Sequence, residues 1–134
     1  PAIVAGGGAP EAYLASGLKD WADRFEGREQ LAIKKYAEAL EIIPLTIAEN
    51  AGMDPIDTMI TLRAKQAQGK KWTGIDARNT RIADMYSLDI IEPVAVKEQI
   101  IKSATEAACM ILRIDDVIAS SGRGGGGGGR PPMG

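Results

Sequence analysis

Apolar residues recur along much of the chain at spacings of three and four, which predicts a mainly helical protein. One helical face is marked, at spacings of four, three and four, by Tyr36, Leu40, Ile43 and Ile47. A later segment carries a similar row, which we expect to face inward: Val96, Ile100, Ala104, Ala107, Ala108 and Ile111. The single cysteine, Cys109, lies close to this row, so we interpret it as a small core residue rather than a nucleophile.

The first two helices are bounded by proline and glycine. A proline in a first turn lacks only an N–H that would be unpaired there, so a helix is predicted from Pro10 to about residue 25. The second helix is predicted from near residue 28 to the sequence NAG at residues 50–52. Pro44 lies inside it and should kink it, because proline removes one backbone hydrogen bond.

The third and fourth helices also begin at prolines. In the sequence DPID, residues 54–57, Asp54 can cap the helix and the following proline fits its first position. This third helix is predicted to stop at Gly69. The fourth helix is predicted to begin with Pro93 in its first turn.

Three short segments have the composition of β-strands. Residues 2–5, Ala-Ile-Val-Ala, form a candidate buried strand. Residues 74–85 contain two candidate strands around Arg78-Asn79-Thr80, which predicts a hairpin. Residues 113–119 are rich in β-branched side chains, so we expect the fourth helix to give way to a C-terminal strand there.

Composition narrows the function classes. The 134 residues are 45% hydrophobic, enough for one domain with a modest core. A net charge of −2 gives no electrostatic reason to expect nucleic acid or an anionic membrane as the main partner. With no histidine and one cysteine, the chain cannot build a Ser-His-Asp or Cys-His centre or a His-ligated zinc site. Any chemistry in this chain must therefore rest on carboxylates, lysines, hydroxyls or backbone groups.

The sequence AIVAGGGAPEAY, residues 2–13, leaves two interpretations open. Glycines between a strand and a helix let backbone N–H groups approach an anion at the positive end of the helix. The pattern is neither G-x-G-x-x-G nor a P-loop, however, so the residues alone favour a plain tight turn over a phosphate contact. The chain also lacks an initial methionine and begins inside the candidate strand, so we expect it to be a fragment of a longer protein.

Two carboxylates, one next to a turn and one at a helix start, also have both a structural and a ligand-binding interpretation. Asp76, in GIDA, and Glu92, in IIEP, could each accept hydrogen bonds from ribose hydroxyls. The residues alone favour a structural role for both: Asp76 as an ordinary turn former and Glu92 as a cap of its own helix. The last segment, residues 122–134, is so rich in glycine that we expect a flexible tail, with arginine-glycine RNA binding as a weaker alternative.

Three long stretches together resemble one family. In chain order they are VAGGGAPE, REQLAIKKYAEALEIIPLTIAENAGMDPID and IIEPVAVKEQIIKSATEAACMILRIDDVI, followed by the glycine-rich tail. They resemble the C-terminal part of a group II chaperonin subunit, closest to the archaeal thermosome and more distantly to the eukaryotic cytosolic chaperonin. The resemblance covers residues 1–121 and implies a mostly α fold: the helical half of the equatorial ATPase domain, with a small β-hairpin and a C-terminal strand.

The resemblance also implies site residues. In the family the GGGA loop lies against bound nucleotide, which points to backbone contacts from Gly7 and Gly8. The stretch that matches GIDA lines the adenine side, which points to Asp76 and Ala77, and the carboxylate of the matching EP, here Glu92, holds the ribose. The C-terminal strand joins the sheet between subunits.

The function that the resemblance implies is that of a folding machine. Family members form double rings that enclose unfolded proteins and fold them in the cytoplasm with ATP. We expect ATP or ADP as the ligand, with Mg²⁺ in the complete subunit but its ligands outside this chain. The partners would be other subunits and unfolded clients, with no membrane or nucleic acid. Because the main phosphate loop and the water-activating aspartate are missing, we expect no ATP hydrolysis by this chain alone. An isolated helical assembly module without ATPase activity is the alternative.

Overall fold

The computed structural model describes the backbone of residues 2–123 and the side chains of residues 2–110 and 113. Residues 2–94 belong to one compact unit, and from residue 95 the described chain is a single long helix. The elements in chain order are β1 (Ile3–Ala5), α1 (Ala9–Ala22), α2 (Gly27–Asn50), α3 (Pro55–Ala67), β2 (Thr73–Asp76), β3 (Arg81–Asp84), β4 (Ile91–Pro93) and α4 (Val94–Arg123). The predicted mostly helical fold is confirmed. The tail predicted for residues 122–134 lies outside the described residues from residue 124 onward.

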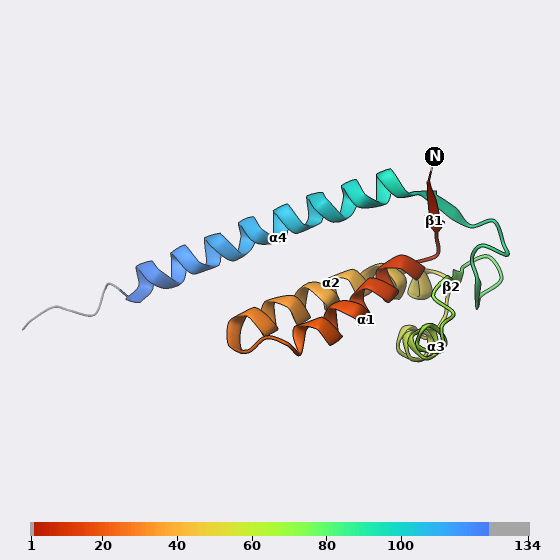
Figure 1. Ribbon diagram of the computed structural model, residues 1–134, viewed down its shortest axis with the longest axis horizontal. Coiled ribbons are helices and arrows are strands. Elements are labelled where there is room, and N and C mark those ends of the chain that lie inside the picture. The colour runs from red at the N-terminus through yellow and green to blue at the C-terminus, as the bar shows by residue number, and fades with distance from the viewer. Residues whose placement is uncertain (1, 124–134) are drawn as a thin grey trace, which may run out of the picture. The chain divides into compact units, whose positions relative to one another are not determined.

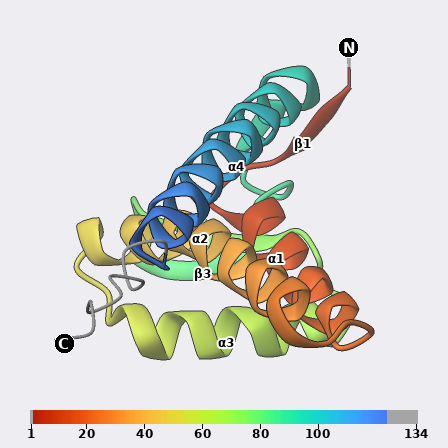
Figure 2. The same ribbon diagram turned by 90° about the vertical axis from the view of Figure 1, so that its left-hand side faces the viewer.

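The first unit is built around α1. Helices α1 and α2 run antiparallel and side by side, while α3 runs across them (Figures 1 and 2). Close packing is possible because the buried face of α1 carries small side chains, and each of three core clusters includes one alanine of this helix: Ala9, Ala12 or Ala15. The three alanines lie one turn apart, so α1 contributes one continuous buried stripe.

The ends of α1, α2 and α3 lie within a few residues of the predicted positions. Asp54 precedes α3, and its side chain accepts a hydrogen bond from the backbone N–H of Asp57 at 2.9 Å. This is the predicted N-cap. α2 ends at Asn50, and its buried Pro44 lies inside the helix as expected. The first helix ends at Ala22, three residues earlier than predicted, in a turn before α2.

Two small antiparallel sheets complete the first unit. β2 and β3 form the predicted hairpin, with Ile75 opposite Ile82 and Asp76 opposite Arg81. β1 pairs with β4, so Ala5 lies opposite Ile91. The prediction of a buried first strand holds only at its end, because Ala5 is buried whereas Ile3 is 48% exposed.

Two expectations about α4 are wrong. Residues 113–119, predicted as a strand, continue the helix to Arg123. A helix satisfies its own backbone hydrogen bonds, whereas a strand needs a partner edge, and none of the described strands pairs with this segment. Cys109 is exposed rather than a core residue, and the expected inward row includes exposed side chains, with Val96 at 54% and Ile100 at 52%.

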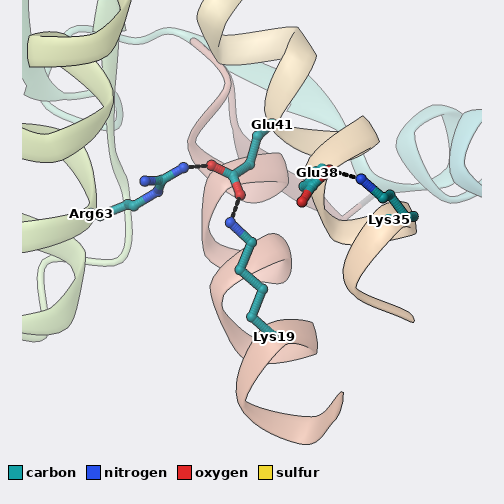
Figure 3. Close-up of polar contacts among 5 residues, drawn as sticks. All are labelled: Lys19, Lys35, Glu38, Glu41 and Arg63. Atoms are coloured by element: carbon teal, nitrogen blue, oxygen red, sulfur yellow. Dashed lines mark hydrogen bonds and ion pairs between the residues drawn. The ribbon is translucent and has the colours of Figure 1, made fainter. Parts of the chain in front are cut away.

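A buried ion-pair triad joins the three helices of the first unit. Glu41 of α2 is buried, and its two carboxylate oxygens contact the ammonium of Lys19 on α1 and the guanidinium of Arg63 on α3 (Figure 3). Both cations lie at the protein surface, with side chains 36% and 44% exposed. The triad therefore ties the helices together at the edge of the core.

Candidate nucleotide pocket

A pocket of about 580 Å³ opens where the glycine loop meets the hairpin. Four segments form it: the loop between β1 and α1, the C-terminal half of α2, the end of β2 with its turn, and the loop before β4. Its lining residues are Gly7, Ile47, Ile75, Asp76, Ala77, Arg78, Asn79, Leu88, Asp89 and Ile90. The volume is within the range of small-molecule sites, about 300–1,000 Å³.

Gly7 lies at the centre of this junction and has no room for a side chain. Its backbone carbonyl accepts a hydrogen bond from the N–H of Ile75 at 2.8 Å, so the loop is bonded directly to β2. Its φ of 64° is in the left-handed region. A Cβ at this position would lie 2.8 Å from the carbonyl oxygen of Ile75 and would also collide with the sulfur of Met85.

Gly8 begins α1 and packs against the proline of α2. A Cβ there would lie 2.8 Å from the Cβ of Pro44, and the φ of Gly8 is 76°. No side chain caps the start of α1. Within the described residues, the backbone N–H groups of Gly7 and Gly8 donate to no acceptor. These N–H groups at a positive helix end are available to an anion.

Asp76 is buried, and its carboxylate holds the hairpin turn together. One oxygen, Oδ2, accepts from the side-chain amide of Asn79 at 2.8 Å and from Nε of Arg81 at 3.1 Å. The other, Oδ1, accepts from the backbone N–H of Asn79 at 3.3 Å. The Asn79 side-chain amide, and then Arg81, lower the pKa of Asp76, so it stays ionised. Its turn-forming role is therefore present in the structure.

The structure brings together some of the predicted site residues and separates others. Gly7, Asp76 and Ala77 line the same pocket, and Gly8 follows directly behind Gly7. Glu92 lies elsewhere, half-buried in β4 opposite Val4, and it does not line this pocket.

Several lining residues were not predicted from the sequence. Ile47 belongs to the apolar row already noted on α2. The sequence therefore predicted its place on that helix, but not that it lines a pocket. Arg78 and Asn79 were recognised only as turn residues. Leu88, Asp89 and Ile90 lie in the loop before β4, and no local pattern in the sequence indicated that this loop lines the pocket. Its position depends on a contact between distant segments, in which the N–H of Gly6 donates to the carbonyl of Ile90 at 2.8 Å.

The pocket offers backbone donors, apolar walls and one rim cation, which suits binding more than bond-breaking chemistry. The N–H group of Gly7 can donate to an anion, and Ile47 and Ile75 supply apolar surface. Arg78 adds a positive charge beside the carboxylates of Asp76 and Asp89. Over the described part of the chain, no three metal-ligating side chains form a cluster. Over the same part, no helix has the length and apolar character to cross a membrane.

Comparison with known proteins gives one consistent result. The model of the TCP-1/cpn60 chaperonin family matches residues 1–121. A thermosome subunit of Methanopyrus kandleri is 57% identical over 118 residues, covering 88% of this chain and 22% of the relative. The thermosome subunit alpha of Sulfolobus acidocaldarius is 56% identical over 122 residues, covering 90% and 22%. The chain thus spans about a fifth of the length of these curated relatives.

A solved structure agrees with the sequence comparisons. The open-state monomer of a group II chaperonin from Methanococcoides burtonii superposes with a TM-score of 0.79 at 48% sequence identity. The match covers 83% of this chain and 28% of that one. The likeness therefore extends over most of the described elements.

Proposed function

The chain belongs to the TCP-1/cpn60 chaperonin family, and from this we propose that it is the C-terminal equatorial part of an ATP-dependent chaperonin subunit. In this proposal the complete subunit assembles into a double ring in the cytoplasm and folds unfolded proteins. This chain contributes to nucleotide binding and to contacts between subunits. The observation that carries the proposal is the convergence of Gly7, Asp76 and Ala77 on one pocket from segments about 70 residues apart.

Each predicted site residue has a proposed role. The N–H groups of Gly7 and Gly8 contact nucleotide phosphate, because they are unpaired within the described residues and lie at the start of α1. Ala77 and the backbone of Asp76 line the adenine side, while the carboxylate of Asp76 keeps the turn in place. Glu92 holds the ribose only if the nucleotide extends beyond the pocket toward β4.

Phosphoryl transfer needs more than these groups. It requires a metal ion, a phosphate clamp and a positioned water together, and Mg²⁺ would supply charge neutralisation between the phosphates. In this proposal the ligands of the ion belong to the rest of the subunit. We therefore expect the purified chain, given Mg²⁺ and ATP, to release no phosphate above background. Turnover without a second polypeptide would contradict this assignment.

A chimeric subunit tests the function directly. The matching segment of the Methanopyrus kandleri thermosome subunit is replaced by residues 1–121 of this chain, which is feasible because the two are 57% identical. We expect the chimera to form rings by size-exclusion chromatography and to hydrolyse ATP. Gly7→Val should lower nucleotide affinity at least tenfold, because the loss of one charge-assisted contact is of that order.

The control is Gly17→Ala in the same chimera, since a Cβ at Gly17 meets no atom within 4 Å. This variant should retain both ring formation and ATPase activity. A chimera that assembles but neither binds nor hydrolyses ATP would instead support an assembly module without nucleotide function. Refolding of a denatured client by the chimera, with and without ATP, tests the proposed partners.

A further inference from the structure

A second pocket, of about 510 Å³, lies at the other end of β2 and shares no lining residue with the first. The loop between α3 and β2 supplies half of its lining residues, and α3, β2 and β3 supply the rest. It is lined by Lys65, Gly69, Lys70, Lys71, Trp72, Thr73, Ala83 and Asp84. This site, which we call the lysine pocket, has no role in the function proposed above.

The lysine pocket is positively charged, although the chain as a whole carries a net charge of −2. Three lysines and one aspartate line it, which leaves a local charge of about +2. No ion pair in the described part of the chain involves Lys65, Lys70 or Lys71. Asp84 forms no ion pair with these lysines in the described structure, and its Oδ1 accepts instead from the backbone N–H groups of Tyr86 at 2.9 Å and Ser87 at 3.2 Å.

The wall that carries these charges is held in place by named contacts. Nε2 of buried Gln66 donates to the carbonyl of Thr73 at 3.1 Å, and the carbonyl of Trp72 accepts from Met85 N–H at 3.1 Å. The indole of Trp72 packs edge-on against Tyr86, with ring centroids 5.1 Å apart. The pocket is therefore fixed before any ligand arrives, which lowers the entropy lost on binding.

The ring of Trp72 is part of this wall and is not a free stacking surface. The ammonium of Lys71 lies over it, 4.7 Å from the ring centroid. Stacking of a base or another flat ligand would have to displace this cation. Ligand recognition is therefore left to the ammonium groups, which act as point charges suited to oxyanions.

We propose that the lysine pocket binds a small multivalent oxyanion of the phosphate or pyrophosphate type through Lys65, Lys70 and Lys71. Such an anion neutralises the excess positive charge of the pocket, where none of the three ammonium groups forms an ion pair in the described structure. Its compact charge matches a recessed pocket better than an extended polyanion would. The source is either a free phosphate compound or the phosphate tail of a nucleotide, and both present the same chemistry.

The experiment uses the full chain with Trp21→Phe, so that Trp72 is the only tryptophan and reports on the pocket by fluorescence. Sodium pyrophosphate and ADP are titrated separately at constant ionic strength, and calorimetry measures the affinities independently of the indole signal. We expect a saturating response, weakened at least about tenfold by combined Lys65→Gln and Lys70→Gln. Lys35→Gln, on α2, is the matched control and should leave the affinity unchanged.

Several results would overturn the proposal. They are a response that does not saturate, an equal response to sodium chloride, or an unchanged affinity in the double lysine variant with a native circular dichroism spectrum. Tighter binding of a hexaglutamate peptide than of pyrophosphate would assign the pocket to acidic protein segments instead. Ala77→Val in the same background separates the two pockets, because Ala77 lines only the first one, so this change should weaken ADP there without changing pyrophosphate binding.

Discussion

The ion-pair triad predicts an asymmetry between removing its anion and removing its cations. Glu41 is buried, with 5% of its side chain exposed, whereas Lys19 and Arg63 are more than one-third exposed. If Glu41 is replaced by leucine, both cations can turn to water and no buried charge is left behind. If both cations are replaced by alanine, the carboxylate stays in the core without a partner.

The magnitudes follow from this geometry. An uncompensated buried charge costs about 3–5 kcal/mol, so Lys19→Ala combined with Arg63→Ala should lower the free energy of unfolding by about that amount. Glu41→Leu should cost less than about 1 kcal/mol, because the lost attraction involves cations that solvent already screens. For each single cation variant, the loss in the free energy of unfolding should fall between these two values, because Glu41 keeps one partner.

Urea denaturation of the full chain, followed by circular dichroism at 222 nm, measures these differences. The exposed pair of Lys35 and Glu38, whose Nζ and Oε2 atoms lie 3.3 Å apart, provides the control. Figure 3 draws this pair beside the triad. Glu38→Ala should change the free energy of unfolding by less than about 0.5 kcal/mol, as is usual for surface pairs. The reasoning is refuted if Glu41→Leu destabilises the protein as much as the double cation variant does.

Three further predictions concern local structure. Asp54→Ala removes the N-cap of α3 and should cost about 1 kcal/mol in urea denaturation; an unchanged midpoint would mean that the cap contributes nothing. Because the folded-state pKa of Asp76 is lowered, its stabilising effect is complete above the unfolded pKa of about 4 and is lost as pH falls through the lower folded value. Unfolding midpoints of Asp76→Asn should therefore depend less on pH in that acidic window, and parallel profiles would contradict the assignment. Gly8→Ala should destabilise by more than about 1 kcal/mol, whereas Gly17→Ala should stabilise by up to about 1 kcal/mol; equal effects of the two in thermal melts would exclude the steric argument.

Local signals in the sequence were sufficient for most of the helices and the hairpin. The cap at Asp54 and the turn between β2 and β3 depend on residues within a few positions of each other, so the sequence contains their whole cause. Pairing of β1 with β4 depends instead on segments about 90 residues apart, and no local pattern encodes that register. The triad at Glu41 was not predicted for the same reason, since its three side chains come from three helices.

Only some residues of the candidate site were predicted, because they were identified by family resemblance and not by their own chemistry. Gly7, Asp76 and Ala77 do meet at one pocket. The resemblance could not show that both carboxylate oxygens of Asp76 accept hydrogen bonds from residues of its own hairpin. Arg78 and Ile47 were missed as lining residues because their contribution depends on how α2 packs beside the turn.

In the glycine loop, the structural turn is compatible with the proposed phosphate contact. Gly7 and Gly8 are required sterically, because side chains there would collide with Ile75, Met85 and Pro44. The same tight packing fixes the loop against β2 and leaves its two N–H groups without acceptors in the described structure. A loop held rigidly with unpaired donors costs little further order when an anion binds. In the proposed function, the same packing would hold the loop ready for phosphate. Gly7→Val should therefore impair both packing and nucleotide binding, whereas a change that weakens nucleotide binding alone is expected at Ala77.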